Sequence, residues 1–189
     1  MLINHNLYYI KKKMTKVALS LGTNIGNRAG HLKAMQRGIS KLLCSPVTFS
    51  SPMETSALEV EESHPPYLNQ IVCGFFSGTA FELLDMCKAL EHSLGRTHKG
   101  MKKPRTADID ILLFGEEQIC SQELTIPHRA ILKRLFCLKG LNQVCPELSI
   151  PGTGKTVREN LIKTDSEIKK QNVLFLTDSQ LGFEAIYEF

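Results

Sequence analysis

The 189-residue sequence lacks any long hydrophobic run, and its six cysteines form no C-x-x-C pair. No apolar stretch approaches the roughly 20 residues that a membrane-spanning helix requires, so we expect no transmembrane segment and no membrane partner. A disulfide framework is typical of short secreted chains rather than of a chain this long with an ordinary core. We therefore expect buried free thiols, a reducing compartment and a cytoplasmic protein.

An excess of charge of one sign is also missing. The 23 basic and 19 acidic side chains leave a net charge of only +4, and the two signs are mixed along most of the chain. This balance is too mild to indicate a nucleic-acid partner. It leaves room for a local basic patch that serves an anionic small molecule.

The length and a hydrophobic fraction of 42% predict one globular domain with a core of useful size. Residues 1–13 lack an apolar h-region and end in three lysines, so they are interpreted as a polar extension rather than a signal peptide. Met14 is an alternative start, and the choice between Met1 and Met14 stays open. We place the domain at residues 14–163 and a tail at 164–189, where residues 173–176 either form a strand or lack order.

The most informative segment is Pro104–Gly115, in which Asp108 and Asp110 alternate with apolar residues. Period-two alternation predicts a half-buried strand, whose residues i and i+2 face the same side. The two carboxylates then stand roughly 6.5–7 Å apart along the backbone. Such a pair could cap a strand or form surface ion pairs with Arg105. Hard oxygen ligands side by side also suit Mg²⁺, completed by substrate phosphates and water.

Basic side chains on both sides of this segment favour the metal interpretation. Positive charge and Mg²⁺ at one place suit a polyphosphate, whose charge shifts during transfer. Arginine can bind phosphate oxygens two at a time. The basic residues before the strand are Arg96, His98, Lys99, Lys102, Lys103 and Arg105, and those after it are His128, Arg129 and Arg134.

The order of the expected elements is β-α-β-β-α-β. This order predicts an α+β, ferredoxin-like fold, an antiparallel sheet with two helices on one face. We expect strands at about 17–22, 47–51, 68–77 and from Asp108, helices at 29–43 and 80–94, and loops at 52–66 and 96–103. C-terminal additions are expected as a hairpin around Ile119 and Leu124, a short helix opened by Pro127, and a helix at 133–144.

The run from Gly152 to Thr156 looks like the end of a P-loop, G-x-x-x-x-G-K-[ST]. However, Ser149 occupies the first glycine position, and no clear βαβ unit surrounds the run. We therefore predict a turn before a C-terminal helix rather than a P-loop NTPase.

The motifs and their order resemble the 6-hydroxymethyl-7,8-dihydropterin pyrophosphokinase family over about Val17 to Leu161. The strongest motif is Pro104–Leu113. The other matching pieces occur in family order, and they are Leu21–Asn24, Tyr67–Asn69, Glu91 through Arg96, and Pro127–His128.

This resemblance implies an ATP-dependent diphosphotransferase of folate biosynthesis. ATP would donate its β,γ-pyrophosphoryl group to the hydroxymethyl oxygen of the pterin, with release of AMP. Two Mg²⁺ ions would bind Asp108 and Asp110. We expect small-molecule substrates, a monomer, and action beside other folate-pathway enzymes.

The resemblance also implies individual site residues. Those implied for catalysis are Arg96, Arg105, Asp108 and Asp110. Those implied for ATP binding are Glu91, Arg96, Arg105, Ile111, His128 and Arg134. Those implied for the pterin are Thr55, Leu58, Tyr67, Asn69, Asp108 and Phe136, with Phe136 stacked on the flat ring.

Three departures from the family pattern lie near this site. Relatives often carry a tryptophan in the loop before the Pro-Arg motif, whereas this chain has none and places Lys102 there. His98 stands where a second arginine is common, and Arg129 where an aromatic residue is frequent.

An alternative interpretation of the sequence is a ferredoxin-like module that binds RNA or a regulatory ligand. That reading predicts exposed aromatic residues on the strands, which offer few.

Overall fold

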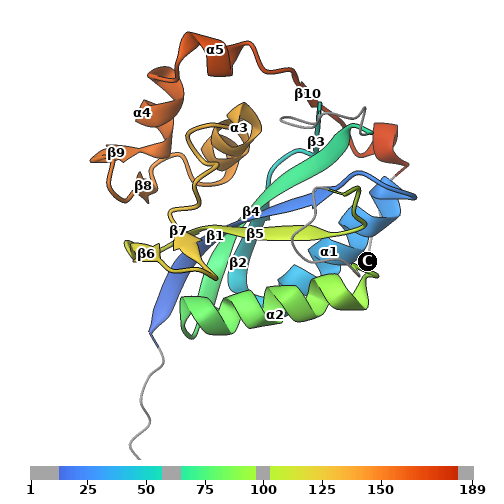
Figure 1. Ribbon diagram of the computed structural model, residues 1–189, viewed down its shortest axis with the longest axis horizontal. Helices are drawn as coiled ribbons and strands as arrows, with labels where there is room; N and C mark the ends of the chain where they lie inside the picture. Colours follow the sequence, from blue (N-terminus) through green and yellow to red (C-terminus); the bar gives the residue numbers. More distant parts are fainter. Residues whose placement is uncertain (1–12, 57–64, 97–102, 183–189) are drawn as a thin grey trace, which may run out of the picture.

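The computed structural model describes residues 13–56, 65–96 and 103–182, and its centre is an antiparallel sheet (Figure 1). The strand order is β10-β3-β4-β1-β5, and β2 also pairs with β4. The central strands β1 (Met14–Thr23) and β4 (Tyr67–Ser77) pair along ten residues. The other strands are β2 (Cys44–Phe49), β3 (Met53–Thr55), β5 (Asp108–Phe114) and β10 (Val173–Phe175).

Helices α1 (Arg28–Leu42) and α2 (Ala80–Ser93) lie side by side on one face of this sheet (Figure 1). The start of α1 is capped by the side chain of Asn27, and the start of α2 by a capping box of Thr79 and Glu82. In α1, Leu32, Met35 and Ile39 are fully buried, and each contributes roughly 1.5–3 kcal/mol by leaving water.

The opposite face of the sheet is covered by the C-terminal part of the chain. Helix α3 (Leu135–Val144) packs on β4, and α4 (Val157–Ile162) packs on α3 (Figure 1). A second apolar cluster lies between them and the sheet and includes Ile71, Leu112 and Leu141. The sheet is therefore covered by helices on both faces rather than on one. The smaller elements are β6 (Ile119–Cys120), β7 (Thr125–Ile126), β8 (Ser149–Ile150), β9 (Lys155–Thr156), α5 (Ser166–Lys169) and the 3-10 helix η1 (Ser179–Leu181).

The structure corrects two expectations drawn from the sequence and decides a third that was left open. The expected loop 52–66 contains strand β3, which pairs with β4. The expected short helix after Pro127 is a series of turns, and α3 begins only at Leu135. For residues 173–176 the sequence left a strand or a lack of order open. Residues 173–175 form strand β10, which pairs with β3.

The glycine-containing run at 152–156 is a turn followed by a helix, as its sequence indicated. Strands β8 and β9 form a two-stranded hairpin around it, and α4 begins after a capping box of Thr156 and Glu159. A P-loop instead requires a strand, a phosphate-cradling loop and a helix in succession. The P-loop interpretation therefore fails.

The six cysteines are free thiols, four of them buried, with Cys44 and Cys120 exposed. Within the described ranges, no helix combines the length and apolar character needed to cross a bilayer.

Candidate active site

Asp108 and Asp110 stand on one face of β5, as their alternation with isoleucines predicted. Ile109 and Ile111 point to the opposite face and join the apolar cluster under α1 and α2. The neighbouring strand β1 places Gly22 opposite Asp108 and Ser20 opposite Asp110. The carboxylates thus lie on the face of the sheet that also carries α3.

Two arginines converge on Asp108 from different segments. Arg96, which follows α2, donates to Oδ1 of Asp108 over 2.7 Å. Arg105 donates to the same oxygen over 3.0 Å. The three side chains are about one-fifth exposed. A partly buried carboxylate with two guanidinium groups concentrates positive charge where a phosphate could bind.

Glu91, in the last turn of α2, supports this arrangement from behind. Its Oε1 atom accepts a hydrogen bond from the backbone N–H of Ile109 over 2.6 Å and another from Arg96. Only 8% of the residue is exposed. Burial raises the pKa of Glu91 to about 7, while the Ile109 N–H and the Arg96 charge oppose the shift.

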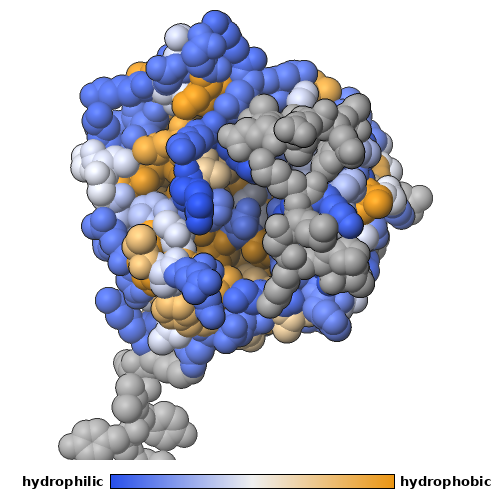
Figure 2. Space-filling view, in the orientation of Figure 1, coloured by the Kyte–Doolittle hydropathy of each residue, from blue (hydrophilic) through white to orange (hydrophobic). Residues whose placement is uncertain are grey.

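Asp110 lies beside His128, whose Nε2 atom is 4.0 Å from the Asp110 Oδ1 atom. Both line a pocket of about 120 Å³ together with Leu84 of α2 and Thr125 of β7. Burial and the charge of Asp108 raise the pKa of Asp110, and His128, Arg134 and Arg96 oppose that shift. Figure 2 shows a hollow near the centre of one face of the molecule, where apolar and hydrophilic residues meet.

Asn24, to which the sequence alone assigned no role, anchors the Pro-Arg segment. It is fully buried, its Oδ1 atom accepts from the Arg105 N–H over 2.8 Å, and its own N–H donates to the Arg105 carbonyl over 3.1 Å. Asn24 thereby fixes the backbone of Arg105, the residue whose guanidinium binds Asp108. The contact joins two distant parts of the chain, so only the recurrence of Asn24 in the resembling motif could have drawn attention to it.

Gly22 is a second residue that sequence reasoning missed. A Cβ atom at Gly22 would lie 3.0 Å from the Asn69 Oδ1 atom and 3.7 Å from the Asp108 Cβ atom. Because Gly22 has no side chain, the space between the Asn69 and Asp108 side chains stays open.

The residues expected to face the pterin lie on β3, β4 and α3. Thr55 accepts a hydrogen bond from the Asn69 side chain over 2.9 Å, and Tyr67 is paired with Thr55 in the sheet. Phe136, on the first turn of α3, is 7% exposed and belongs to the second apolar cluster. Arg134 is the residue immediately before α3.

Two of the implied site residues, Ile111 and Leu58, are not placed in the site in the same way. The Ile111 side chain packs under the helices and touches the site only as part of the lining of the small pocket beside Asp110. Leu58, and the basic residues His98, Lys99 and Lys102, lie outside the described residues.

Across residues 13–56, 65–96 and 103–182, no three His, Cys, Asp or Glu side chains gather in a way that could enclose a metal. What β5 offers is a pair of carboxylates. Mg²⁺ is usually bound by one or two carboxylates, with water and substrate phosphates completing its shell. The donor set of Asp108 and Asp110 fits that requirement.

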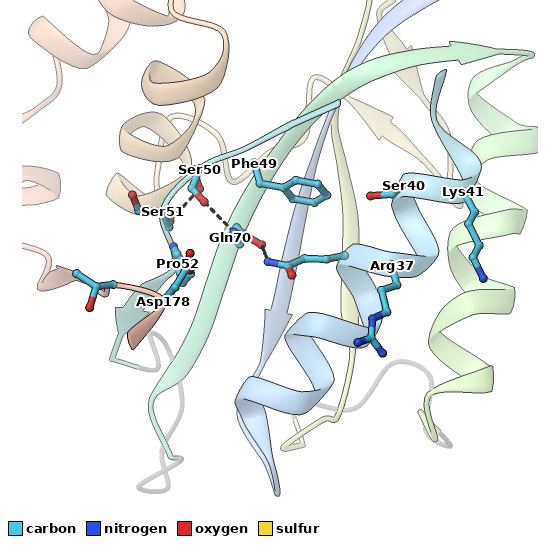
Figure 3. A pocket seen from close by; sticks show the side chains of 11 residues that line it. Arg37, Ser40, Lys41, Phe49, Ser50, Ser51, Pro52, Gln70 and Asp178 are labelled. Carbon is cyan, nitrogen blue, oxygen red and sulfur yellow. Dashed lines mark hydrogen bonds between the residues drawn. The ribbon is translucent and has the colours of Figure 1, made fainter. Parts of the chain in front are cut away.

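A larger cavity of about 840 Å³ lies between α1, β2 and the segment around Asp178, away from Asp108. Gln36 donates to Gln70 over 2.7 Å, and Gln70 donates to the Ser50 carbonyl over 2.7 Å. Arg37 and Lys41 extend from α1 and also line this cavity (Figure 3). None of the implied site residues lines this cavity.

Comparison with known proteins gives one consistent result. Residues 18–146 match the model of the family described as 7,8-dihydro-6-hydroxymethylpterin-pyrophosphokinase (HPPK). The chain is 36% identical over 136 residues to 2-amino-4-hydroxy-6-hydroxymethyldihydropteridine pyrophosphokinase of Bacillus subtilis (strain 168), covering 71% of this chain and 81% of that protein. It is 32% identical over 160 residues to the protein of the same name from Methylorubrum extorquens (strain ATCC 14718 / DSM 1338 / JCM 2805 / NCIMB 9133 / AM1), covering 80% and 95%.

Longer proteins are similar over part of their length. The folate synthesis bifunctional protein of Chlamydia trachomatis serovar D (strain ATCC VR-885 / DSM 19411 / UW-3/Cx) is 35% identical over 69% of this chain, which spans 30% of that protein. The crystal structure of wild-type Plasmodium falciparum HPPK-DHPS with pteroate superposes with a TM-score of 0.67 at 17% identity, covering 83% of this chain and 45% of the other. At that identity the structural likeness shows the fold alone.

Proposed function

The chain belongs to the 7,8-dihydro-6-hydroxymethylpterin-pyrophosphokinase family, and we propose that the face of β5 carrying Asp108 and Asp110 is where its reaction takes place. The family's activity is transfer of a pyrophosphoryl group from ATP to hydroxymethyldihydropterin in folate synthesis. The observation that carries the site assignment is the position of the two aspartates, side by side on one strand face, with two arginines bonded to one of them.

Asp108 and Asp110 would bind two Mg²⁺ ions. When bound, such ions neutralise charge on the polyphosphate of ATP. Asp110 stands beside His128, and Asp108 beside Arg96 and Arg105, so the carboxylates already lie among cations suited to phosphate oxygens. The metal-binding role is supported by the match between the donor set and the preference of Mg²⁺ for oxygen ligands.

The cationic side chains would hold the transferred group. Arg96 and Arg105 both reach Asp108 and are therefore within reach of phosphates bound beside it. His128 lies beside Asp110, and the positive charge of Arg134 acts on the same carboxylate. Phosphoryl transfer to a hydroxyl depends mainly on positioning and on charge stabilisation, so a strong general base is not required. Glu91 would keep Arg96 oriented, and Ile111 would line the nucleotide pocket.

The pterin would bind along Thr55, Tyr67 and Asn69, opposite the start of α3. Asn69 has amide donor and acceptor atoms suited to the edge of a flat heterocycle, and its bond to Thr55 fixes the orientation of that amide. Phe136 would contribute its ring from α3. We also propose that Leu58 contacts the pterin.

The order β5-β1-β4-β2 within the sheet supports a ferredoxin-like arrangement for the domain at residues 14–163. We infer a monomer that works in the cytoplasm beside other folate enzymes. Relatives with the printed name folate synthesis bifunctional protein support the last point.

Identification of the nucleotide product tests this function. The protein is incubated with Mg²⁺, ATP and 6-hydroxymethyl-7,8-dihydropterin, and the nucleotides are separated. We expect AMP to form only when the pterin is present. Formation of ADP, or no turnover, would reject the assignment.

A further inference from the structure

Helix α3 carries Phe136 in its first turn, yet it lacks a cap of its own. Arg134, the N-cap residue, makes no side-chain bond to the helix. Instead Gln171 supplies the missing partner. Its Oε1 atom accepts from the Leu135 N–H over 2.9 Å, and its Nε2 atom donates to the Lys133 carbonyl over 2.8 Å. The first turn of a helix has free N–H groups, so a distant amide stabilises this end.

The residues that follow Gln171 bind the other wall of the site. Val173 pairs with Thr55 and Phe175 with Met53, and the Leu176 N–H donates to the Pro52 carbonyl over 2.8 Å. Strand β3 thereby gains a partner on its outer side. Phe175 also lies under Lys139 of α3, with the ammonium group 5.8 Å from the ring centroid.

We propose that the segment Gln171–Leu176 is a tie that sets the spacing between β3 and the start of α3, with Gln171 as its positioning residue. The inference rests on the proposed function, because Thr55 on β3 and Arg134 and Phe136 at α3 matter only if they bind substrates. The tie lies beyond residue 146, where the match to the family model ends.

A tie of this kind acts on substrate binding rather than on the transfer step. Without the Gln171 bonds, the start of α3 would spend less time in the competent position. Binding of the substrates and of the transition state would weaken equally. The KM values of the substrates should therefore rise, while kcat should stay unchanged. A bond of this kind corresponds to an increase in KM of about fivefold to tenfold.

Steady-state kinetics of Gln171→Ala, with Gln180→Ala as the matched control, tests the tie. Gln180 is a nearby glutamine outside the tie, and among the described residues its side chain accepts hydrogen bonds only from Thr177. We expect Gln171→Ala to raise KM about fivefold to tenfold with kcat within twofold of wild type, and Gln180→Ala to change neither. Gln171→Glu, which keeps the acceptor for Leu135, should recover part of the loss.

Amide hydrogen exchange at Leu135 separates failure of the tie from failure of the proposed function. We expect Gln171→Ala to lose protection at Leu135, and this readout does not depend on activity. Unchanged protection overturns the tie, and so does lost protection with a wild-type KM or with a fall in kcat alone. Absence of pterin-dependent AMP formation by the wild type would instead overturn the proposed function.

Discussion

At the scale of single residues, the site is built from charges that restrain one another. Asp108 is bonded to two guanidinium groups, and Glu91 is bonded to one of these and to the backbone of β5. A buried carboxylate in such a place is expensive to ionise unless its partners compensate. The pKa of Glu91 is raised, so its bonds to Arg96 and Ile109 only partly offset the cost of burying its charge.

This incomplete compensation predicts a pH dependence of stability. Between about pH 4.5 and 7, folded Glu91 keeps a proton that the unfolded chain has released, so the free energy of unfolding should fall as pH rises through that window. Glu91→Gln cannot ionise and should lose this slope. The variant should gain about 2–3 kcal/mol relative to wild type from the acid end to the neutral end.

Urea unfolding at several pH values between these limits measures the difference. The exposed control Glu117→Gln should run parallel to wild type. If Glu91→Gln also runs parallel to wild type, the folded protein does not retain the proton.

At the scale of elements, the position of α3 depends on a glycine that lets it approach the sheet. A Cβ atom at Gly140 would lie 2.3 Å from the Ile71 Cγ1 atom and 2.9 Å from the Met53 Cε atom. Real side chains do not come so close, so the helix or its neighbours would have to move. Since α3 also carries Phe136, the close approach at Gly140 also determines how near Phe136 lies to the sheet.

Gly140→Ala should therefore destabilise the fold by about 1–3 kcal/mol through overpacking. Ile71→Ala removes the Cγ1 atom that the new Cβ atom at position 140 would clash with. A double-mutant cycle therefore isolates the contact between positions 140 and 71. In chemical denaturation, we expect Gly140→Ala to cost clearly less in the Ile71→Ala background than in wild type. Equal costs in both backgrounds would show that the helix does not rest on Ile71.

At the scale of the whole molecule, local patterns predicted the strands and helices that carry charges, but not the contacts between distant segments. The alternation around Asp110 is contained in seven residues, and the structure confirms the strand face that it predicted. The pairing of β10 with β3 has no local signal, because three residues show no periodicity and their partner lies far away in the chain. The hydrogen bond that the Arg105 N–H donates to the Asn24 side chain has no local sequence signal either, because the two residues are far apart in the chain.

The expected loop at 52–66 shows the same limit from the other side. Pro52 and the glutamates there favour a loop, yet β4 offers free backbone groups beside Met53–Thr55 and turns them into a strand. Tertiary pairing with β4 therefore overrode the local propensity of these residues.

Turnover of Asp108→Asn and Asp110→Asn tests whether the carboxylate pair on β5 supports pyrophosphoryl transfer. The exposed Asp85→Asn on α2 serves as the control, and AMP formed from ATP with pterin is measured under saturating Mg²⁺. We predict a loss of on the order of 10³-fold in kcat for each site variant, with urea midpoints close to wild type and no loss for the control. Near-normal turnover in either site variant would show that the carboxylate pair does not support the transfer.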